Sequence, residues 1–148
     1  MLQRINQASV SIDGEVVARV NRGLLVLLGL FRNDCEDQAI WLAQKTLSLR
    51  IFPDEAKAMN RSIIEVGGDI LVVSQFTLAA DTLRGNRPGF SRAADPAHAK
   101  PLYSSYVNEL RKISQNVQTG VFGADMQISL VNDGPVTIML ERTPGTDN

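Results

Sequence analysis

The sequence predicts an α/β domain in which two helices are set among short strands. Short apolar or alternating runs recur along the chain, and the longest unbroken ones lie at 24–30 and 70–73. Two other segments, 34–49 and 95–114, place apolar residues at every third or fourth position, as one face of a helix does. A chain of 148 residues fits one domain with a buried core. The order of these elements predicts a mixed sheet, or two β layers, with helices on one side.

Three strands are predicted before the first helix. Residues 3–12 alternate loosely, and Asp13-Gly14 separates them from a second run at 15–20. Asp-Gly between two strand-like runs is a strong signal for a hairpin. A turn at 21–23 then leads into the third strand at 24–30, whose unbroken apolar character is typical of burial on both faces.

Each helix has a start signal. Asn33 or Asp34 is expected to cap the first helix. Asp95 is expected to cap the second, with Pro96 at its first position, where the missing amide hydrogen has no effect. Pro101 either kinks the first turn of this helix or marks the start of its main part.

The rest of the chain is predicted to form strands and loops. The further strands lie at 63–66, 70–73, 126–130 and 136–140. The polar segment 79–89 has the length of a functional loop. Residues 132–135, Asn-Asp-Gly-Pro, are read either as a hairpin loop or as a fixed Gly-Pro unit that presents two carbonyls. We expect one domain over residues 1–142 and a polar C-terminal tail over 143–148.

Composition narrows the possible partners and locations. The net charge of -1 indicates no general affinity for nucleic acid, so DNA is not expected and any RNA contact must be local. The local candidate is the basic stretch from Arg84 to Lys100. No apolar run approaches the length of a membrane span, and the first residues lack the apolar region of a signal peptide. The single cysteine, Cys35, suits a reducing cytoplasm.

Acid–base side chains are scarce. His98 is the single histidine and reads as a surface residue of the second helix, and Cys35 lies among acidic residues that oppose a reactive thiolate. No metal site and no nucleotide or dinucleotide motif is visible, so no cofactor is expected. The polar residues Ser74 to Thr77 directly follow the strand at 70–73. Either Ser74 or Thr77 is a nucleophile that needs a base, or the amides of Phe76 and Thr77 form an oxyanion hole.

Two motifs give the sequence a family resemblance. Ser74-Gln75-Phe76-Thr77-Leu78 and Asn132-Asp133-Gly134-Pro135-Val136-Thr137 resemble the two signature motifs of the D-aminoacyl-tRNA deacylases, the D-Tyr-tRNA deacylase family. Further matches, such as Arg84-Gly85-Asn86-Arg87-Pro88, extend the resemblance from about Gln3 to Leu140. Gly89, where the family usually has Ser, and Pro101, in a helix usually free of proline, depart from the pattern.

The resemblance implies a fold, a reaction and a site. The fold would be a three-layer α/β/β domain that forms a homodimer, and the reaction would be hydrolysis of the ester between a D-amino acid and the terminal adenosine of tRNA. Catalysis would lie at Ser74, Gln75, Phe76 and Thr77, with assistance from the 2′-hydroxyl of the tRNA. Gly134 and Pro135, joined by a cis peptide bond, would enter the partner subunit's pocket and exclude L-amino acids, and Arg4 would orient them. Glycyl-tRNA would then also be accepted.

Several alternatives remain open from the sequence. Arg84 and Arg87 are the candidates for contact with tRNA. Thr77 is retained as an alternative covalent nucleophile. A non-catalytic module that binds the tRNA end, and an esterase of small molecules, are retained as alternative functions.

Overall fold

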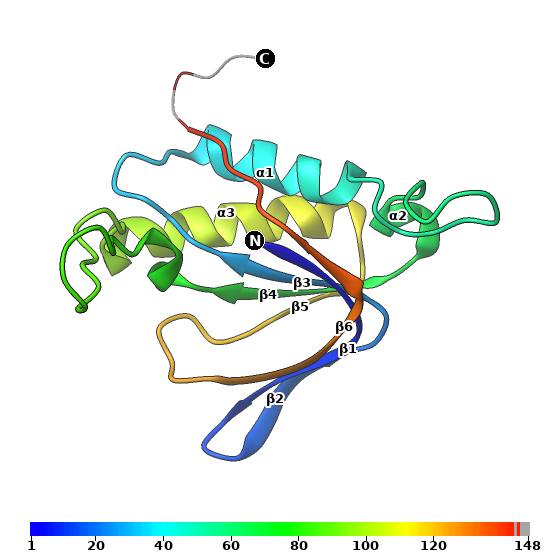
Figure 1. Ribbon diagram of the computed structural model, residues 1–148, viewed down its shortest axis with the longest axis horizontal. Helices are drawn as coiled ribbons and strands as arrows, with labels where there is room; N and C mark the ends of the chain where they lie inside the picture. Colours follow the sequence, from blue (N-terminus) through cyan, green and yellow to red (C-terminus); the bar gives the residue numbers. More distant parts are fainter. Residues whose placement is uncertain (144, 146–148) are drawn as a thin grey trace.

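Two long helices lie across one face of a central group of strands, and a second group of strands covers the other face (Figure 1). The structure, a computed structural model, describes residues 1–143 and 145. The strands are β1 (Leu2–Ile12), β2 (Glu15–Val20), β3 (Gly23–Leu28), β4 (Asp69–Ser74), β5 (Val117–Thr119) and β6 (Gln127–Ile138). The helices are α1 (Glu36–Ser48), α2 (Ile63–Val66) and α3 (Pro96–Ile113), with a 3₁₀ turn, η1 (Phe76–Ala79).

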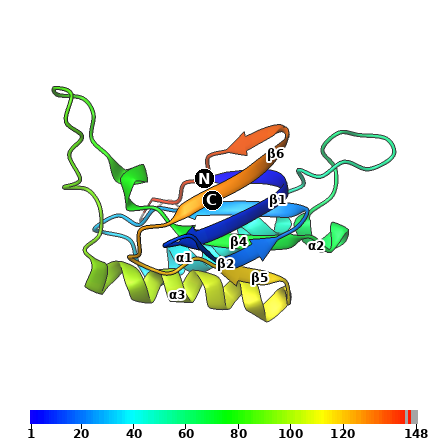
Figure 2. The ribbon, with the colours of Figure 1, turned by 90° about the horizontal axis from the view of Figure 1, so that it is seen from below.

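The sheet is mixed, as predicted. Its strands are ordered β2-β1-β3-β4-β5, with β6 also paired to β1. The pairs β3–β4 and β4–β5 are parallel, whereas every pair that includes β1 is antiparallel. The first residues of β1 pair with β3 and its later residues pair with β2. Therefore β1 leaves the central layer and enters the outer one, where β2 and β6 flank it (Figure 2).

Two apolar cores separate the three layers. Alternate residues of β3 and β4, such as Leu24, Val26 and Val72, pack against α1 and α3. The residues between them, such as Leu25 and Leu71, pack against β1 and β2. Burial on both faces explains why β3 and β4 are apolar throughout. The predicted three-layer α/β/β fold is confirmed.

Tyrosine hydroxyls connect α3 to its neighbours. The Tyr103 hydroxyl donates to the carbonyl oxygen of Val72 in β4 at 3.0 Å, and burial raises the pKa of Tyr103 to about 12. The Tyr106 hydroxyl lies 2.8 Å from the Thr46 hydroxyl of α1. The first bond ties α3 to the strand that leads into Ser74, and the second ties α3 to α1.

The segment 63–66 is a helical turn and the predicted strand there is wrong. The Ser62 amide donates to the Glu65 carboxylate at 2.6 Å, and the Glu65 amide donates to the Ser62 hydroxyl at 3.3 Å. This reciprocal cap satisfies the first donors of a helix. Gly67 then ends the turn with φ 60°, in the left-handed region that suits glycine. Capping therefore outweighs the strand preference of the β-branched residues.

The two strands predicted at 126–130 and 136–140 are one strand, β6. The chain does not reverse at 132–135, because residues on both sides of this segment pair with β1. Ile5 faces Asn132 and Gln3 faces Thr137, so five steps along β6 span two steps along β1. The additional residues bulge out of the ladder instead of forming a hairpin loop. The short strand β5 was not predicted.

Of the two predicted helix caps, the one at Asp95 is confirmed and the one at Asn33 or Asp34 is wrong. The Asp95 carboxylate accepts from the His98 amide at 3.0 Å, and α3 begins at Pro96 and continues through Pro101. The alternative that this helix starts at Pro101 is therefore wrong. The cap of α1 is Cys35, the extended residue directly before Glu36, and the Asp34 carboxylate accepts instead from the Phe31 amide at 2.8 Å.

Most of the predicted C-terminal tail, 143–148, lies outside the described residues. Among the described residues, no helix is both long and apolar enough to cross a membrane.

Candidate active site

The first half of the candidate site is the turn that follows β4. Ser74 ends the strand, opposite Leu28 of β3, and the Gln75 amide donates to the Leu28 carbonyl at 2.8 Å. The chain then forms η1, which packs against Gly29. A Cβ atom on Gly29 would lie 2.9 Å from the Cβ of Leu78 and 3.2 Å from the Gln75 carbonyl oxygen. Glycine at position 29 therefore allows this close approach of the turn to the end of β3.

Two backbone amides of this turn have no protein partner. Phe76 and Thr77 supply the first two amides of η1, which have no acceptor within a helical turn because of their position. Neither amide donates to any other group in the described part of the chain. Both residues are exposed. Adjacent unpaired donors at the end of a buried strand are available to bind a carbonyl oxygen, as the donors of an oxyanion hole do.

The Thr77 hydroxyl is engaged with a neutral amide. Gln75 Nε2 donates to Thr77 Oγ1 at 2.6 Å. Within residues 1–143, no histidine, carboxylate or amine forms a hydrogen bond with the Ser74 or Thr77 hydroxyl. The side chain of Gln75 therefore orients this hydroxyl without being able to take a proton from it.

Two hollows have Ser74 and Phe76 in their linings. One has a volume of about 350 Å³ and is mainly apolar, with Leu30, Ala99 and Phe122 in its lining. The other has a volume of about 230 Å³ and includes the segment 123–126 in its lining. The Phe76 ring meets the Phe90 ring edge-on, with centroids 5.1 Å apart. The first hollow has the size and character of a site for a small organic group.

The second half of the candidate site is the bulge in β6. The Gly134–Pro135 peptide bond is cis, and Gly134 has φ 133°. Asn132 closes the bulge on itself: its Oδ1 accepts from the Val136 amide at 2.7 Å and its Nδ2 donates to the Val136 carbonyl at 3.2 Å. Thr137 also accepts from Asn132 Nδ2, at 3.0 Å. The asparagine therefore replaces the ladder partners that the bulge removes.

Arg4 fastens this bulge to the rest of the protein. Its Nε donates to the Asp133 carbonyl oxygen at 3.1 Å and lies 3.1 Å from the Asp133 carboxylate. Its other arm donates to the Ile51 carbonyl oxygen at 2.6 Å. The side chain is buried, with 10% of its surface exposed. The sequence pointed to Arg4, but its partners Asp133 and Ile51 were missed, because a backbone carbonyl leaves no signal in residue type.

The two halves lie at opposite ends of the chain's own sheet (Figure 1). Arg4 pairs with Leu24 at the start of β3, whereas Gln75 binds Leu28 at its end. Four strand residues at about 3.3 Å each separate these points by roughly 13 Å. The structure therefore brings Ser74–Thr77 together, and Arg4 together with Gly134 and Pro135, but it does not join the two groups within one copy.

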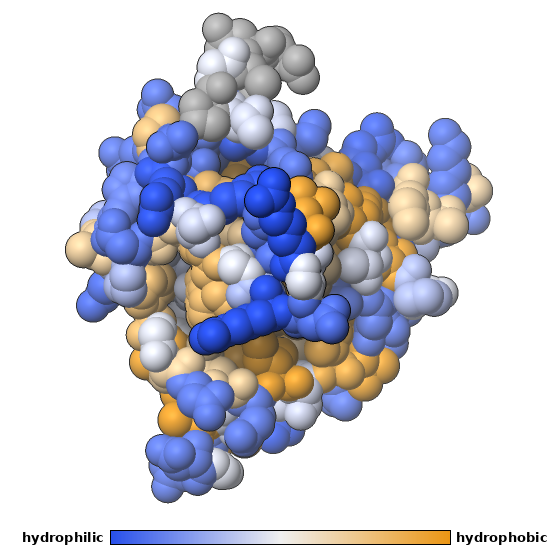
Figure 3. Space-filling view, turned by 60° about the vertical axis from the view of Figure 1, so that its left-hand side comes forward, coloured by the Kyte–Doolittle hydropathy of each residue, from blue (hydrophilic) through white to orange (hydrophobic). Residues whose placement is uncertain are grey.

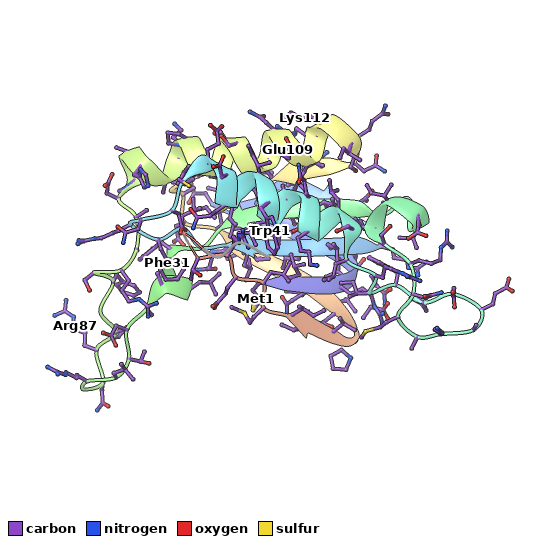
Figure 4. All side chains as sticks on the ribbon, turned by 90° about the horizontal axis from the view of Figure 1, so that it is seen from above. Met1, Phe31, Trp41, Arg87, Glu109 and Lys112 are labelled. Carbon is purple, nitrogen blue, oxygen red and sulfur yellow. The ribbon has the colours of Figure 1, made fainter. Side chains whose placement is uncertain are left out.

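Arg84 and Arg87 lie on the loop that follows η1. They are exposed on the long loop at 81–89, whose ends are joined by paired amides and carbonyls of Asp81 and Gly89. Neither arginine forms an ion pair in the described part of the protein. Figure 4 shows Arg87 at the far end of the molecule, on the same side as Phe31.

Comparisons with known proteins identify the family of this chain. The family model for D-Tyr-tRNA(Tyr) deacylase matches residues 1–141. The D-aminoacyl-tRNA deacylase of Chlorobaculum tepidum is 54% identical over 142 residues, which cover 95% of both chains. That of Flavobacterium psychrophilum is 49% identical, again over 95% of both chains.

Two solved structures resemble the fold. One, titled c-Myc DNA Unwinding Element Binding Protein, has a TM-score of 0.90 and 39% identity, and covers 96% of this chain and 97% of that chain. The other, a probable eukaryotic D-amino acid tRNA deacylase, has a TM-score of 0.77 over 90% of this chain, and its 18% identity supports the fold alone. The family match over nearly the whole chain confirms the resemblance seen in the two motifs, and the chain belongs to the D-Tyr-tRNA(Tyr) deacylase family.

Proposed function

We propose that two copies of this deacylase hydrolyse the ester of D-aminoacyl-tRNA at a site to which each copy contributes one half. Deacylation of D-aminoacyl-tRNA is the activity for which its relatives are named. The amides of Phe76 and Thr77 would bind the scissile carbonyl of the ester. Gly134 and Pro135 of the other copy would close the pocket around the amino acid.

The observation that carries the mechanism is the pair of unpaired amides on η1. The reaction places negative charge on the carbonyl oxygen of the ester, and two donors already in position stabilise that charge. Removal of one donor of this kind costs about 10²–10³ in rate in other hydrolases. The 2′-hydroxyl of the terminal ribose would assist, because the nearby protein side chains offer no base. Thr77 as a covalent nucleophile is disfavoured because its hydroxyl contacts only Gln75.

The separation of the two halves supports a homodimer. A two-fold axis would bring the β6 bulge of each copy to the η1 turn of the other. Apolar side chains are exposed on the outer β layer, where such a contact requires them. They are Val16 and Val17 of β2, Leu130 and Val131 of β6, and Met139. We also infer a cytoplasmic location, since tRNA is aminoacylated and used in translation there.

Selection against L-amino acids would follow from exclusion. The carbonyls of Gly134 and Pro135 would occupy the space that an L side chain needs, whereas a D side chain points away from them. The pocket then need not recognise the side chain itself. We therefore expect several D-amino acids, and glycine, to be accepted.

The test is a paired deacylation assay with D-Tyr-tRNA and L-Tyr-tRNA. Release of D-tyrosine with intact L-Tyr-tRNA is expected, and equal cleavage of both would refute selection by exclusion. A substrate whose terminal adenosine lacks the 2′-hydroxyl should react far more slowly. Size-exclusion chromatography with light scattering measures the oligomeric state, and a monomer with full activity would refute the shared site.

A second candidate function is binding of a nucleic acid end without catalysis. It is favoured by the solved structure at 39% identity, whose title describes a protein that binds a DNA unwinding element. Retained tRNA binding with no turnover of any D-aminoacyl-tRNA would support it. Cleavage of free D-amino acid esters as fast as the tRNA ester would instead support an esterase of small molecules.

A further inference from the structure

Another hollow lies near the active-site turn, and none of the residues Ser74 to Thr77 lines it. Its volume is about 590 Å³, and its lining includes Gly29, Phe31, Arg32, Arg92 and Arg142. We call it the arginine hollow. Figure 3, which brings this end of the molecule forward, shows strongly hydrophilic side chains lying beside and across a hollowed apolar surface.

The backbone holds Arg32 and Arg92 beside each other. The Arg32 amide donates to the Arg92 carbonyl at 3.1 Å, and Phe31 forms an isolated antiparallel bridge with Ala93. The Arg92 guanidinium lies 5.3 Å from the centre of the Phe31 ring, and this contact restricts its motion. Both arginines are exposed, and neither forms an ion pair with a carboxylate of the described residues.

Two carboxylates also line the arginine hollow. Asp34 accepts from the Phe31 amide and from Gln38, and its burial raises its pKa. Burial lowers the pKa of the Met1 amino group, and the nearby Glu141 carboxylate partly offsets this lowering. Neither acid lies within 4 Å of the guanidinium of Arg32 or Arg92. The two arginines therefore remain available to an anion from solution.

Alternate residues of the segment 28–31 line the arginine hollow and the hollow of the active site. Leu28 and Leu30 line the hollow that contains Ser74 and Phe76, whereas Gly29 and Phe31 line the arginine hollow. The loop that carries Arg87 projects at the same end (Figure 4). In a chain of net charge -1, Arg32 and Arg92 thus lie close to the active-site turn without an ion-pair partner among the described residues.

We propose that the arginine hollow binds backbone phosphates of the tRNA acceptor end whose terminal adenosine carries the ester. This rests on the proposed function, and it assigns the substrate's phosphates to Arg32 and Arg92, beyond the loop arginines. Planar guanidinium groups match phosphate oxygens in pairs, and such contacts fix the register of a nucleic acid without reading its sequence. The site would therefore accept many tRNAs and position the ester of each at η1.

The experiment compares Arg32→Gln and Arg92→Gln with the control Lys57→Gln. Lys57 is exposed on the loop between α1 and α2, so the control removes one positive charge away from both the hollow and the outer β layer. Binding of uncharged tRNA is measured by fluorescence anisotropy between 50 and 200 mM salt, since the salt dependence counts the phosphates that the protein neutralises. Turnover is measured on D-Tyr-tRNA and on D-tyrosyl-adenosine, an ester that lacks the backbone phosphates.

Each hollow variant is expected to bind tRNA about tenfold more weakly and to reduce the salt slope by about 1. KM for D-Tyr-tRNA should rise similarly, while turnover of D-tyrosyl-adenosine stays at the wild-type level. Affinity and slope equal to those of Lys57→Gln would overturn the proposal, and so would an equal loss on both esters. Duplex DNA that binds as tightly as tRNA, and loses as much affinity in the variants, would also overturn the assignment to tRNA.

The outcomes separate this proposal from the proposed function. A wild-type protein that cleaves neither ester would refute the proposed function. The binding of uncharged tRNA would still decide whether the arginine hollow holds phosphates.

Discussion

Arg4→Met tests the anchor of the β6 bulge. Methionine keeps the apolar stem of the side chain but removes the guanidinium, which donates to the carbonyls of Asp133 and Ile51 and pairs with the Asp133 carboxylate. Ile51 is buried, so its carbonyl would lose a charged donor with little access to water. The Asp133 side chain is 31% exposed, so water would replace part of the lost pairing there.

The expected loss of stability is about 3 kcal/mol. A hydrogen bond to a charged group contributes about 1.5–3 kcal/mol, and the loss at Asp133 is discounted for its exposure. For a domain of this size, about 3 kcal/mol lowers the melting temperature by roughly 6–12 °C. Arg4→Lys, which retains the charge without the planar fork, should fall between the two proteins.

The assay is urea unfolding at one fixed protein concentration, since a dimer's stability depends on concentration. Lys57→Met is the matched control, because Lys57 is exposed on the loop between α1 and α2 and its loss should change stability by no more than about 0.5 kcal/mol. If Arg4→Met costs no more than this control, the anchoring argument is wrong. The ratio of D-Tyr-tRNA to L-Tyr-tRNA cleavage is measured in parallel. A stability loss with an unchanged ratio would leave Arg4 a structural role and remove its part in selection.

Three further predictions concern the turn and its surroundings. Thr77→Ala should keep substantial deacylase activity, because the amide of the turn remains, and near-complete loss in single-turnover assays would restore the nucleophile. Gly29→Ala should reduce kcat at least about tenfold, because the new Cβ atom would lie 2.9 Å from the Leu78 Cβ atom and displace the turn. A kcat equal to that of the wild type would show that the turn tolerates this displacement. Hydrogen bonds from Ser62 hold the pKa of Glu65 below its ordinary value of 4.5, so this group stabilises the fold above about pH 4.5 and ceases to do so as pH falls through its lowered pKa. Urea unfolding of Glu65→Gln should therefore show a weaker loss of stability on acidification than the wild type, and parallel curves would contradict this.

The fold was predictable where one local signal acts alone. Asp13-Gly14 forms the expected two-residue hairpin, with both residues at positive φ, and Asp95 with Pro96 starts α3. The apolar run at 70–73 is fully buried between the two cores. In these cases the sequence pattern and the tertiary packing favour the same conformation.

Prediction failed where two signals compete. Ile63 and Ile64 favour a strand, but Ser62 and Glu65 form a reciprocal cap that favours a helix. The Asn-Asp-Gly-Pro segment favours a reversal of the chain, but the length of β1 extends the ladder past it. Three-residue β5 is defined by its pairing with β4, and so short a segment has too little pattern of its own.

The candidate site was only partly readable for a different reason. The motif residues Ser74 to Thr77 and Gly134-Pro135 could be found because the motifs are readable from residue type alone. That the Phe76 and Thr77 amides have no acceptor can be seen only once the hydrogen bonds of the folded turn are known. Likewise, the carbonyl of Ile51 becomes a partner of Arg4 only through the fold, and the separation of the two halves depends on the register of β3.

The unpaired amides of Phe76 and Thr77 have a consequence for how the activity can be lost by mutation. Every amino acid except proline carries a backbone N–H, so replacing a side chain at either position leaves the amide in place. Under the proposed mechanism, an alanine scan would not detect these two positions, and other substitutions would act mainly through the packing that orients the turn. Proline at position 77 would remove the donor itself. The proposed mechanism would thus tolerate most single-codon changes at these positions.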